Sequence, residues 1–429
     1  MSGGVCSLYQ EIIAEANQIV RESIDDPKVT AMFENCFGDT LTKTTKYLDD
    51  GTVFLVTGDI PAMWLRDSSL QLRPYLPFLG KYKELDQLVK GVINRQIDFI
   101  LKDPYANAFN ETANGNRWDD DIPLQEPSIW EQKYEIDSVC FPFQLAYQYW
   151  KYTGDTSIFT ETFKKAAQTV LSLWKVEQNH TDFSTYSFQR PETEDLCNDG
   201  KGSPVGYTGM TWSGFRPSDD ACVYHYLIPS NLFAVRILEI MSEIFEDIYQ
   251  DGALQLAAKN LSAEISYGIQ QYGEIKNDAG QTMYAYEVDG LGNHLLMDDS
   301  NMPSLLSLPM LTNMEKTDEK YQTTRNFVLS KRNPYYFEGT CARGVGSPHT
   351  PHGYIWPIAL AVEGITGNSQ REKWEKIQLI CQNDANTNQA HESFDCHDST
   401  QFTREWFSWA NAMFCELVLD YCGRQVRYK

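Results

Sequence analysis

The sequence predicts an all-α fold, an (α/α)6 barrel in which helical hairpins close into a ring and long loops gather at one end. Apolar residues recur at the spacing of amphipathic helices in about a dozen segments, and loops of very unequal length join these segments. Alternating strand patterns are few and short, and the clearest lie at residues 52–57 and 283–288. The chain therefore lacks the regular strand and helix alternation of a parallel α/β sheet.

The helices are predicted from apolar stripes along the whole chain. In one segment Leu85, Leu88, Val92 and Ile100 fall on the same helical face. The predicted helices begin near residues 7, 28, 67, 84, 137, 157, 229, 252, 303, 318, 356, 371 and 403. The boundaries are expected to shift by about two to four residues where a cap or a turn intervenes.

Five long loops interrupt this helical pattern, and they are rich in Trp, Tyr, Asp, Asn, Gly and His. They span residues 104–136, 181–228, 274–302, 333–355 and 383–402. Most other connections are brief and polar. Because binding residues concentrate on long loops held by a rigid scaffold, we expect these five to meet at one mouth of the ring.

The composition indicates one large globular domain over residues 1–429, since no Pro/Gly/Ser-rich linker or low-complexity tract divides the chain. The net charge of −23 repels polyanions, and no basic stripe is present, so nucleic acid is excluded as a partner. Acidity of this kind is also common in bacterial cytosolic proteins for solubility. The oligomeric state is left open.

The sequence favours a cytoplasmic protein that does not contact membranes. Glu11 and Glu15 interrupt the N-terminal stretch where a signal peptide needs an apolar region, and nowhere do eighteen apolar residues run together. The ten cysteines are scattered without CxxC pairs. Such a distribution is typical of reduced, mostly buried thiols.

The most informative segment is Gly58–Pro74, which places Asp59, Trp64, Arg66 and Asp67 among apolar residues. Carboxylates beside a guanidinium can hydrogen bond to vicinal hydroxyls in fixed directions, and an indole covers the C–H face of a pyranose ring. This pattern predicts the rim of a sugar pocket. A buried ion pair of the arginine with either aspartate, pinning a loop, is the alternative.

Two further loops carry carboxylates that fit glycoside hydrolysis. One contains Asp219 and Asp220, and the other contains Glu392, Asp395 and Glu405. Cleavage of a glycosidic bond needs one carboxylic acid and one carboxylate on opposite sides of a pocket. Two loops far apart in sequence can meet that requirement, although solvated or helix-capping carboxylates are the alternative.

Metal and nucleotide sites are not supported by the spacing of the histidines and cysteines. His391, Cys396 and His397 lie close together, and His349 and His352 lie three residues apart, but neither set has the spacing of a zinc site. The Gly-rich residues 344–350 lack a P-loop lysine. We therefore expect no cofactor and no metal.

Ten motifs, in matching order over roughly residues 30–422, closely resemble glycoside hydrolase family 125. They are GDIPAMWLRDSSLQLRPY, KDPYANAFN, WEQKYEIDSVCFPFQLAY, TGMTWSGFRPSDD, YLIPSN, EVDGLGN, MDDSNMPSLL, YIWPIAL, HESF and REWFSWANAMFCELVLDY. The resemblance implies an exo-acting, inverting, metal-independent α-1,6-mannosidase on an (α/α)6 barrel. Its implied substrates are α-1,6-linked mannosides and N-glycan fragments.

The same resemblance assigns residues to roles. The first Asp of RPSDD, Asp219, is the implied general acid, and the Glu of HESF, Glu392, is the implied general base. Trp64, Arg66 and Asp67 are the implied wall for the terminal mannose. Further residues expected in this pocket are Asp59, Trp212, Arg216, His349 and His391.

The residues alone leave some alternatives open. Pro217 and Ser218 could open a helix whose N-terminus would lower the pKa of Asp219, whereas a general acid needs a raised pKa, so Asp220 stays a competing acid. Another (α/α)6 enzyme is a competing function, either a glucosidase or an epimerase that uses His349 and His391 as a basic pair. A non-catalytic mannoside-binding protein is a third possibility.

Overall fold

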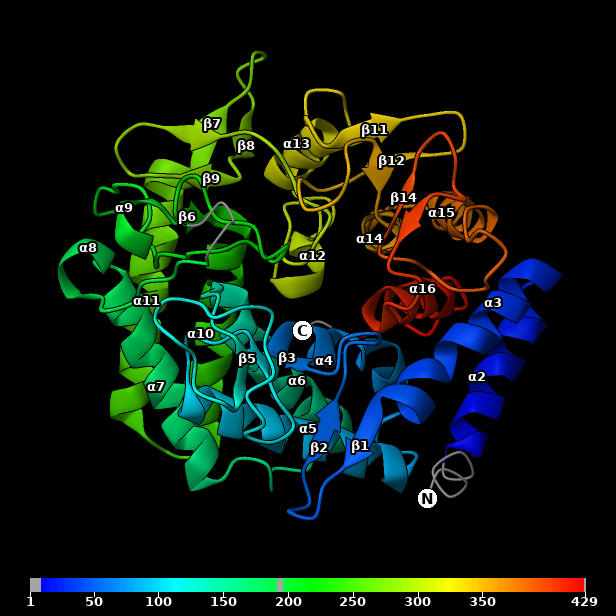
Figure 1. The fold of residues 1–429 in the computed structure, drawn as a ribbon, viewed down its shortest axis with the longest axis horizontal. Helices are drawn as coiled ribbons and strands as arrows, with labels where there is room; N and C mark the ends of the chain where they lie inside the picture. Colours follow the sequence, from blue (N-terminus) through cyan, green and yellow to red (C-terminus); the bar gives the residue numbers. More distant parts are fainter. Residues whose placement is uncertain (1–8, 191–195, 428–429) are drawn as a thin grey trace.

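Paired helices form the framework of the structure, a computed structural model that describes residues 9–190 and 196–427 (Figure 1). The inner helices are α4 (Leu65–Leu70), α6 (Ile136–Thr153), α10 (Ile228–Asp247), α12 (Leu308–Leu311), α14 (Pro357–Thr366) and α16 (Ser408–Tyr421). The outer helices are α3 (Pro27–Phe37), α5 (Lys83–Lys102), α7 (Glu161–Glu177), α11 (Gly252–Gly268), α13 (Glu319–Val328) and α15 (Gln370–Gln382). The helix α2 (Gln10–Ser23) packs against α3.

Burial separates the inner from the outer helices. Every residue of α14 is buried, whereas α11 buries only Ala258, Leu261, Ile265 and Gly268, at the spacing of a single helical face. The outer helices α5, α11 and α15 pack against the inner helices α6, α10 and α14. Inner helices also contact one another. The contacting pairs are α4 with α6, α6 with α10, α10 with α12, α14 with α16, and α16 with α4. The hairpins therefore close into the predicted ring.

Local sequence accounts for several helix starts. Asp26 accepts hydrogen bonds from the backbone amides of Lys28 and Val29, and Pro27 follows it as the first residue of α3. The predicted starts near 84 and 252 lie beside the observed Lys83 and Gly252. The start predicted near residue 7 lies outside the described residues.

The starts predicted near 303 and 403 are displaced the most, because α12 begins only at Leu308 and α16 only at Ser408. Phe402 and Thr403 instead form the short strand β15, in which Thr403 pairs with Ser393. Cross-strand pairing in the loop region thus delays the helix. The apolar residues within α16 follow a helical spacing, but nothing in the sequence indicated that Phe402 and Thr403 would pair as a strand.

Short strands form small antiparallel sheets at the loop ends of the ring. The strands are β1 (Thr45–Tyr47), β2 (Val53–Leu55), β3 (Met63–Trp64), β4 (Ala108–Phe109), β5 (Ile129–Glu131), β6 (Tyr226–Leu227), β7 (Glu274–Lys276), β8 (Thr282–Tyr284), β9 (Glu287–Val288), β10 (His294–Leu295), β11 (Tyr336–Glu338), β12 (Arg343–Val345), β13 (Tyr354–Ile355), β14 (Ser393–Asp395) and β15 (Phe402–Thr403). Three of the sheets have the strand orders β3-β4-β5, β10-β9-β6 and β13-β14-β15. These sheets hold the long loops in fixed positions.

The remaining helical turns are short, and they connect the larger elements. They are η1 (Thr40–Thr44), η2 (Arg73–Phe78), α8 (His180–Phe183), α9 (Cys197–Gly200) and η3 (Ile269–Gly273). A continuous apolar core runs from Tyr9 to Val426. Among the described residues no helix combines the length and apolarity needed to cross a bilayer.

Candidate active site

A cavity of about 320 Å³ lies where the long loops meet. Each of the five predicted loops contributes to its lining, through Trp118, Asp219, Asn301, His349 and Glu392 in chain order. The expectation that these loops gather at one mouth is confirmed. The lining is completed by Thr57, Ile60, Trp64, Arg66, Asp67, Glu131, Lys133, Arg190, Pro217, Ser218, Trp356, Arg404, Phe407 and Trp409.

Buried aromatic side chains form much of the apolar part of this lining. Trp64, Trp356, Phe407 and Trp409 are all buried. The Phe407 ring lies 6.4 Å from that of Trp356 and 5.8 Å from that of Trp409, with edge-to-face geometry in both pairs. Such faces suit the C–H side of a pyranose ring.

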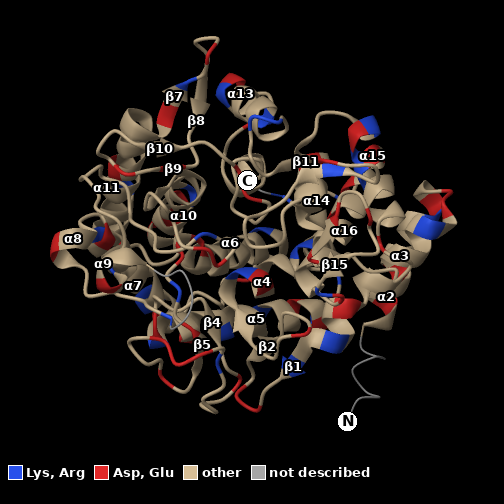
Figure 2. Ribbon diagram, turned by 45° about the horizontal axis from the view of Figure 1, so that its top comes forward, with Lys and Arg blue, Asp and Glu red and all other residues tan. Residues whose placement is uncertain are grey.

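Arg66 lies at the centre of the charged part of the cavity. Arg66 and Asp67 are the adjacent basic and acidic residues of helix α4. This helix lies near the middle of the ring in Figure 2. Its Nη1 donates to Glu135 Oε2 at 2.6 Å and to Asp137 Oδ2 at 3.0 Å, and its Nη2 lies 3.8 Å from Asp219 Oδ1. Arg66 therefore forms buried ion pairs and also lines the cavity. The sequence had offered a sugar pocket and a buried ion pair as alternatives, and Arg66 takes part in both.

Asp67 accepts a hydrogen bond from the Thr57 hydroxyl, and its Oδ1 lies 3.6 Å from Arg66 Nε. Burial raises the pKa of Asp67, and Arg66 and Thr57 only partly oppose that effect. The carboxyl group lines the cavity beside Trp64. The three residues of the WLRD motif that were predicted as a sugar wall thus share one surface.

Asp219 lies in a turn and not in a helix. Its φ is +69°, its amide donates to the Arg216 carbonyl at 2.9 Å, and the Arg216 amide donates to the Asp220 carbonyl at 2.8 Å. The suggestion that Pro217 and Ser218 open a helix is therefore wrong. Both hydrogen bonds lie within residues 216–220, so Asp219 does not stand at the N-terminus of a helix, and no helix dipole lowers the pKa of its carboxyl group.

Nearby cations set the acidity of Asp219 instead. Burial alone would raise the pKa of its carboxyl, but Lys133 and Arg66 outweigh burial, and the pKa is lowered. Lys133 also donates to the Asp219 carbonyl at 2.7 Å, and Asn107 donates to Asp219 Oδ1 at 3.3 Å. The carboxyl group is thus held in place within the cavity.

Asp220 lies beside Asp219 in sequence but points to different partners. Ser218 donates to its Oδ2 at 3.0 Å, and its Oδ1 lies 3.5 Å from His349 Nδ1. Although burial opposes protonation of His349, its hydrogen bond to Asp220 raises the pKa of the imidazole to about 9. His349 is consequently a cation at neutral pH, and it lines the cavity, whereas Asp220 does not.

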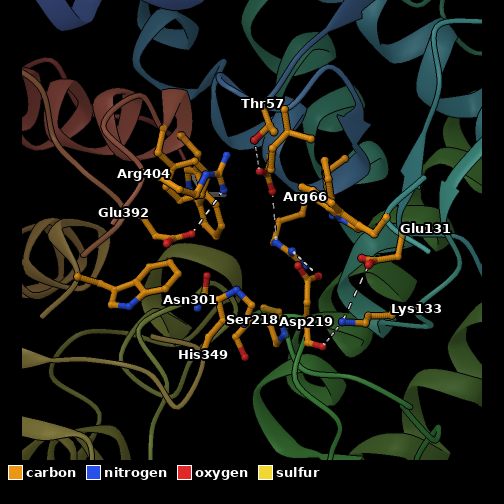
Figure 3. A pocket seen from close by; sticks show the side chains of 18 of the residues that line it. Thr57, Arg66, Glu131, Lys133, Ser218, Asp219, Asn301, His349, Glu392 and Arg404 are labelled. Atoms are coloured by element: carbon orange, nitrogen blue, oxygen red, sulfur yellow. Dashed lines mark hydrogen bonds and ion pairs between the residues drawn. The ribbon is translucent and has the colours of Figure 1, made fainter. Parts of the chain in front are cut away.

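Glu392 faces Asp219 from the opposite wall, as Figure 3 shows. It directly precedes β14, and Arg404, which directly follows β15, places Nη1 3.4 Å from Glu392 Oε1. Arg404 also donates to Asp59 at 2.6 Å. Asp59 therefore reaches the site through Arg404, at the exposed rim, and it does not line the cavity.

Trp212 and Arg216 do not line the cavity, unlike the expectation from the sequence. Trp212 is fully buried, and its ring stacks on those of His180 and His225 at 3.6 and 4.6 Å. Arg216 forms a buried ion pair with Glu287 at 2.6 Å. Both side chains turn into the core because they have strong partners there, and they support the Asp219 turn from behind.

His391 also turns away from the cavity. Its ring stacks on Phe402 at 3.9 Å, and its two nitrogens contact the backbone carbonyls of Glu405 at 3.1 Å and Asp384 at 3.2 Å. His391 therefore fixes the strand that presents Glu392. The two histidines that an epimerase would need do not share one cavity, since only His349 lines it.

Several cavity residues were missed by the sequence reasoning, above all Lys133 and Arg404. Glu131, Lys133 and Glu135 alternate along an extended stretch, and a period of two places such side chains on one face. That signal could have identified Lys133. Arg404 has no comparable signal, because only the pairing of β14 with β15 brings it to Glu392.

Within residues 9–190 and 196–427, no group of three or more His, Cys, Asp or Glu side chains is arranged to hold a metal ion. Four carboxylates surround the Arg66 guanidinium, and two of them, Asp67 and Asp219, line the cavity. Their local partner is thus a protein cation.

Comparison with known proteins identifies the family of this chain. Residues 26–419 match the family described as metal-independent alpha-mannosidase (GH125). The meiotically up-regulated gene 157 protein of Schizosaccharomyces pombe is 36% identical over 447 residues, which cover 98% of this chain and 87% of the relative.

Solved structures show the same similarity. A metal-independent alpha-mannosidase of Streptococcus pneumoniae, solved in a non-productive complex with alpha-1,6-mannobiose, is 47% identical, with a TM-score of 0.94 over 97% of this chain and 98% of that chain. A bacterial glucoamylase complexed with acarbose shares only the fold, with 11% identity and a TM-score of 0.62 over 92% of this chain and 56% of that one. The predicted (α/α)6 barrel is confirmed. The chain belongs to glycoside hydrolase family 125, the metal-independent α-mannosidases.

Proposed function

We propose that the protein is an exo-acting α-1,6-mannosidase that releases non-reducing terminal mannose with inversion of the anomeric configuration. The observation that carries the proposal is one cavity in which the carboxyl groups of Asp219 and Glu392 face each other from opposite walls. Cocrystallised α-1,6-mannobiose in the 47% identical relative supports this linkage. The substrate class is α-1,6-linked mannosides, including N-glycan fragments.

In the proposed mechanism Asp219 is the general acid. It donates a proton to the glycosidic oxygen, so that the leaving group departs as a neutral alcohol. Glu392 is the general base, and it accepts a proton from the water that attacks the anomeric carbon from the other face. One displacement inverts the configuration, and an inverting pair requires its carboxyls to lie roughly 6.5–9.5 Å apart.

The other side chains of the cavity position the sugar. Trp64 offers an apolar face, Arg66 and Asp67 offer hydrogen bonds to hydroxyls, and cationic His349 lies beside Asp219. Arg404 forms an ion pair with Glu392 at 3.4 Å and holds the carboxyl group in position. No step needs a cofactor or a metal.

We also propose that residues 1–429 form a single catalytic domain in the cytoplasm, with no nucleic-acid or membrane partner. The continuous core supports one domain, and the net charge of −23 opposes polyanion binding. The cysteines within the described residues are free thiols, as is usual in a reducing compartment.

Proton NMR of α-1,6-mannobiose hydrolysis tests the proposal directly. We expect β-mannose as the first-formed product, because inversion at an α-linked anomeric carbon gives the β-anomer. Initial α-mannose would instead indicate retention, and an uncut disaccharide would exclude the proposed activity. A Glu392→Gln variant is the matched control for background hydrolysis.

A further inference from the structure

Four carboxyl groups surround one guanidinium beneath Asp219. Arg66 lies within 4 Å of Asp67, Glu135, Asp137 and Asp219. Arg66, Asp67, Glu135 and Asp137 are all buried. Three of the four carboxyls are buried, and one guanidinium balances a single negative charge, so this cluster favours a proton on one of its buried carboxyls.

Hydrogen bonding identifies which carboxyl this is. Glu135 Oε2 accepts from Arg66 at 2.6 Å and from the Ser138 hydroxyl at 2.8 Å. No donor within the described residues reaches the buried Glu135 Oε1, and the Glu135 and Asp219 side chains lie against each other. Two carboxylates are acceptors only, so a hydrogen bond between them requires a proton on one of them.

The surroundings place that proton on Glu135. Burial raises its pKa well above the usual value, Arg66 opposes this, and the negative charges of Asp219 and Asp137 raise it further. Asp219 has the opposite balance, because Lys133 and Arg66 lower its pKa.

Two other titratable groups near Glu135 do not change this balance. Tyr186 and Cys222 are both buried, and burial raises the pKa of each well above its usual value. Both stay neutral at neutral pH. The charged groups that face Glu135 are therefore Arg66, Asp137 and Asp219.

We propose that Glu135 holds a proton in the resting enzyme and shares it with Asp219, so that the two carboxyls together supply the proton for bond cleavage. This inference rests on the proposed function. It explains how an aspartate that is flanked by cations can act as a general acid. Glu135 does not line the cavity, so it acts through Asp219 as a positioning residue.

The proton balance of one turnover is complete. When the glycosidic C–O bond breaks, the Glu135 proton passes to Asp219, and Asp219 donates it to the leaving oxygen, so that Asp219 ends as the carboxylate that it was at rest. Glu135 is left as a carboxylate beside Arg66, while Glu392 takes the proton of the attacking water. Solvent then returns one proton to Glu135 and removes one from Glu392.

The test compares Glu135→Gln with Asp137→Asn. Both wild-type side chains are buried and contact Arg66, but only Glu135 lies against Asp219. We expect Glu135→Gln to lower kcat/KM for α-1,6-mannobiose by roughly 10²-fold or more. The loss on a dinitrophenyl α-mannoside, whose leaving group needs little protonation, is expected to stay below about tenfold. Asp137→Asn should affect both substrates by the same factor.

The pH profile separates proton storage from a structural role. In Glu135→Gln the alkaline limb of kcat/KM for mannobiose should move to lower pH, because Asp219 alone loses its proton more readily. In Asp137→Asn that limb should move much less, because Glu135 keeps its proton although the Asp137 charge that raises its pKa is lost. Equal losses on both substrates with an unmoved limb in Glu135→Gln would overturn the inference.

Infrared spectroscopy gives an answer that does not depend on activity. The wild-type enzyme at neutral pH should show the C=O stretch of a protonated carboxyl that is lost in Glu135→Gln and retained in Asp137→Asn. Labelling glutamate carboxyls with ¹³C should shift this band without any substitution, which covers the case of a misfolded variant. A wild-type enzyme without the band contradicts the inference, whereas an enzyme that shows the band but leaves mannobiose uncut contradicts only the proposed function.

Discussion

Asp219 and Glu392, two of the carboxylates that line the cavity, have different charged neighbours. Asp219 has Lys133 and Arg66 beside it and lies against Glu135, whereas Glu392 forms an ion pair with Arg404. The first arrangement can relay a proton through Asp219, and in the second an arginine lies against the carboxyl group that we propose as the base. Asp220 is held by Ser218 and His349 outside the cavity lining.

Replacing each carboxyl with its amide should therefore have different consequences. Asp219→Asn is expected to reduce mannobiose turnover by roughly 10²–10⁴-fold but to spare much of the turnover of a dinitrophenyl mannoside. Glu392→Gln should suppress both, because either substrate needs an activated water. Steady-state kinetics on the two substrates measures this. Near-normal mannobiose turnover in both variants, together with an inactive Asp220→Asn, would transfer the role to Asp220.

His349 should make the stability of the protein depend on pH. Its pKa rises from 6.5 to about 9 on folding, mainly through Asp220 and against the effect of burial. The stabilisation is therefore complete below pH 6.5 and is lost as the pH rises through 9. Because the side chain is 36% exposed, solvent screening limits the effect to about 1 kcal/mol.

Urea unfolding of the wild type and His349→Gln at pH 6 and pH 10 checks this value. The difference in the free energy of unfolding should be present at pH 6 and should largely vanish at pH 10. A difference of the same size at both pH values would show that packing, and not charge, accounts for it.

At the scale of elements, two segments distant in sequence build the wall that holds Glu392. Gly58 pairs with Phe407, the Asp59 amide donates to the Trp406 carbonyl at 3.3 Å, and Asp59 binds Arg404. The φ of Gly58 is +122°, and a Cβ atom there would lie 2.6 Å from the Trp406 carbonyl oxygen. This junction requires glycine because both the backbone angle and the space exclude a side chain.

Gly58→Ala should therefore lower both stability and activity. We expect a loss of about 1–3 kcal/mol in the free energy of unfolding, from backbone strain and the displaced 406–408 segment. The KM for mannobiose should rise, because Arg404 and Phe407 shift with that segment. Gly51→Ala is the matched control, since Gly51 also has a positive φ of +80° but no described atom lies within 4 Å of its added Cβ. Equal effects of both variants on KM would argue against a tight junction at Gly58.

At the scale of the whole molecule, the ring brings five loops to one cavity whose charges are balanced by arginine, lysine and histidine. We expect activity to be unchanged after prolonged treatment with EDTA, because protein cations occupy the positions that a metal would fill beside these carboxylates. Elemental analysis of the treated enzyme should accompany the assay. Loss of turnover that one divalent metal restores would contradict the expectation.

The sequence by itself determined the helical ring and the motifs of the site. Apolar stripes at helical spacing depend on local periodicity, so the starts near 84 and 252 were predicted to within one residue of Lys83 and Gly252. The WLRD residues, Asp219, Glu392 and His349 were predicted from local motifs, and all of them line the cavity.

Only the tertiary structure decided where the other side chains point. Trp212, Arg216 and His391 were expected in the pocket, but each finds a buried partner in the core, and a one-dimensional pattern contains no information on such partners. Arg404 reaches Glu392 through strand pairing, and Glu135 reaches Asp219 across the base of two loops. Electrostatic interactions depend on distances between atoms that are remote in sequence, and folding alone fixes those distances.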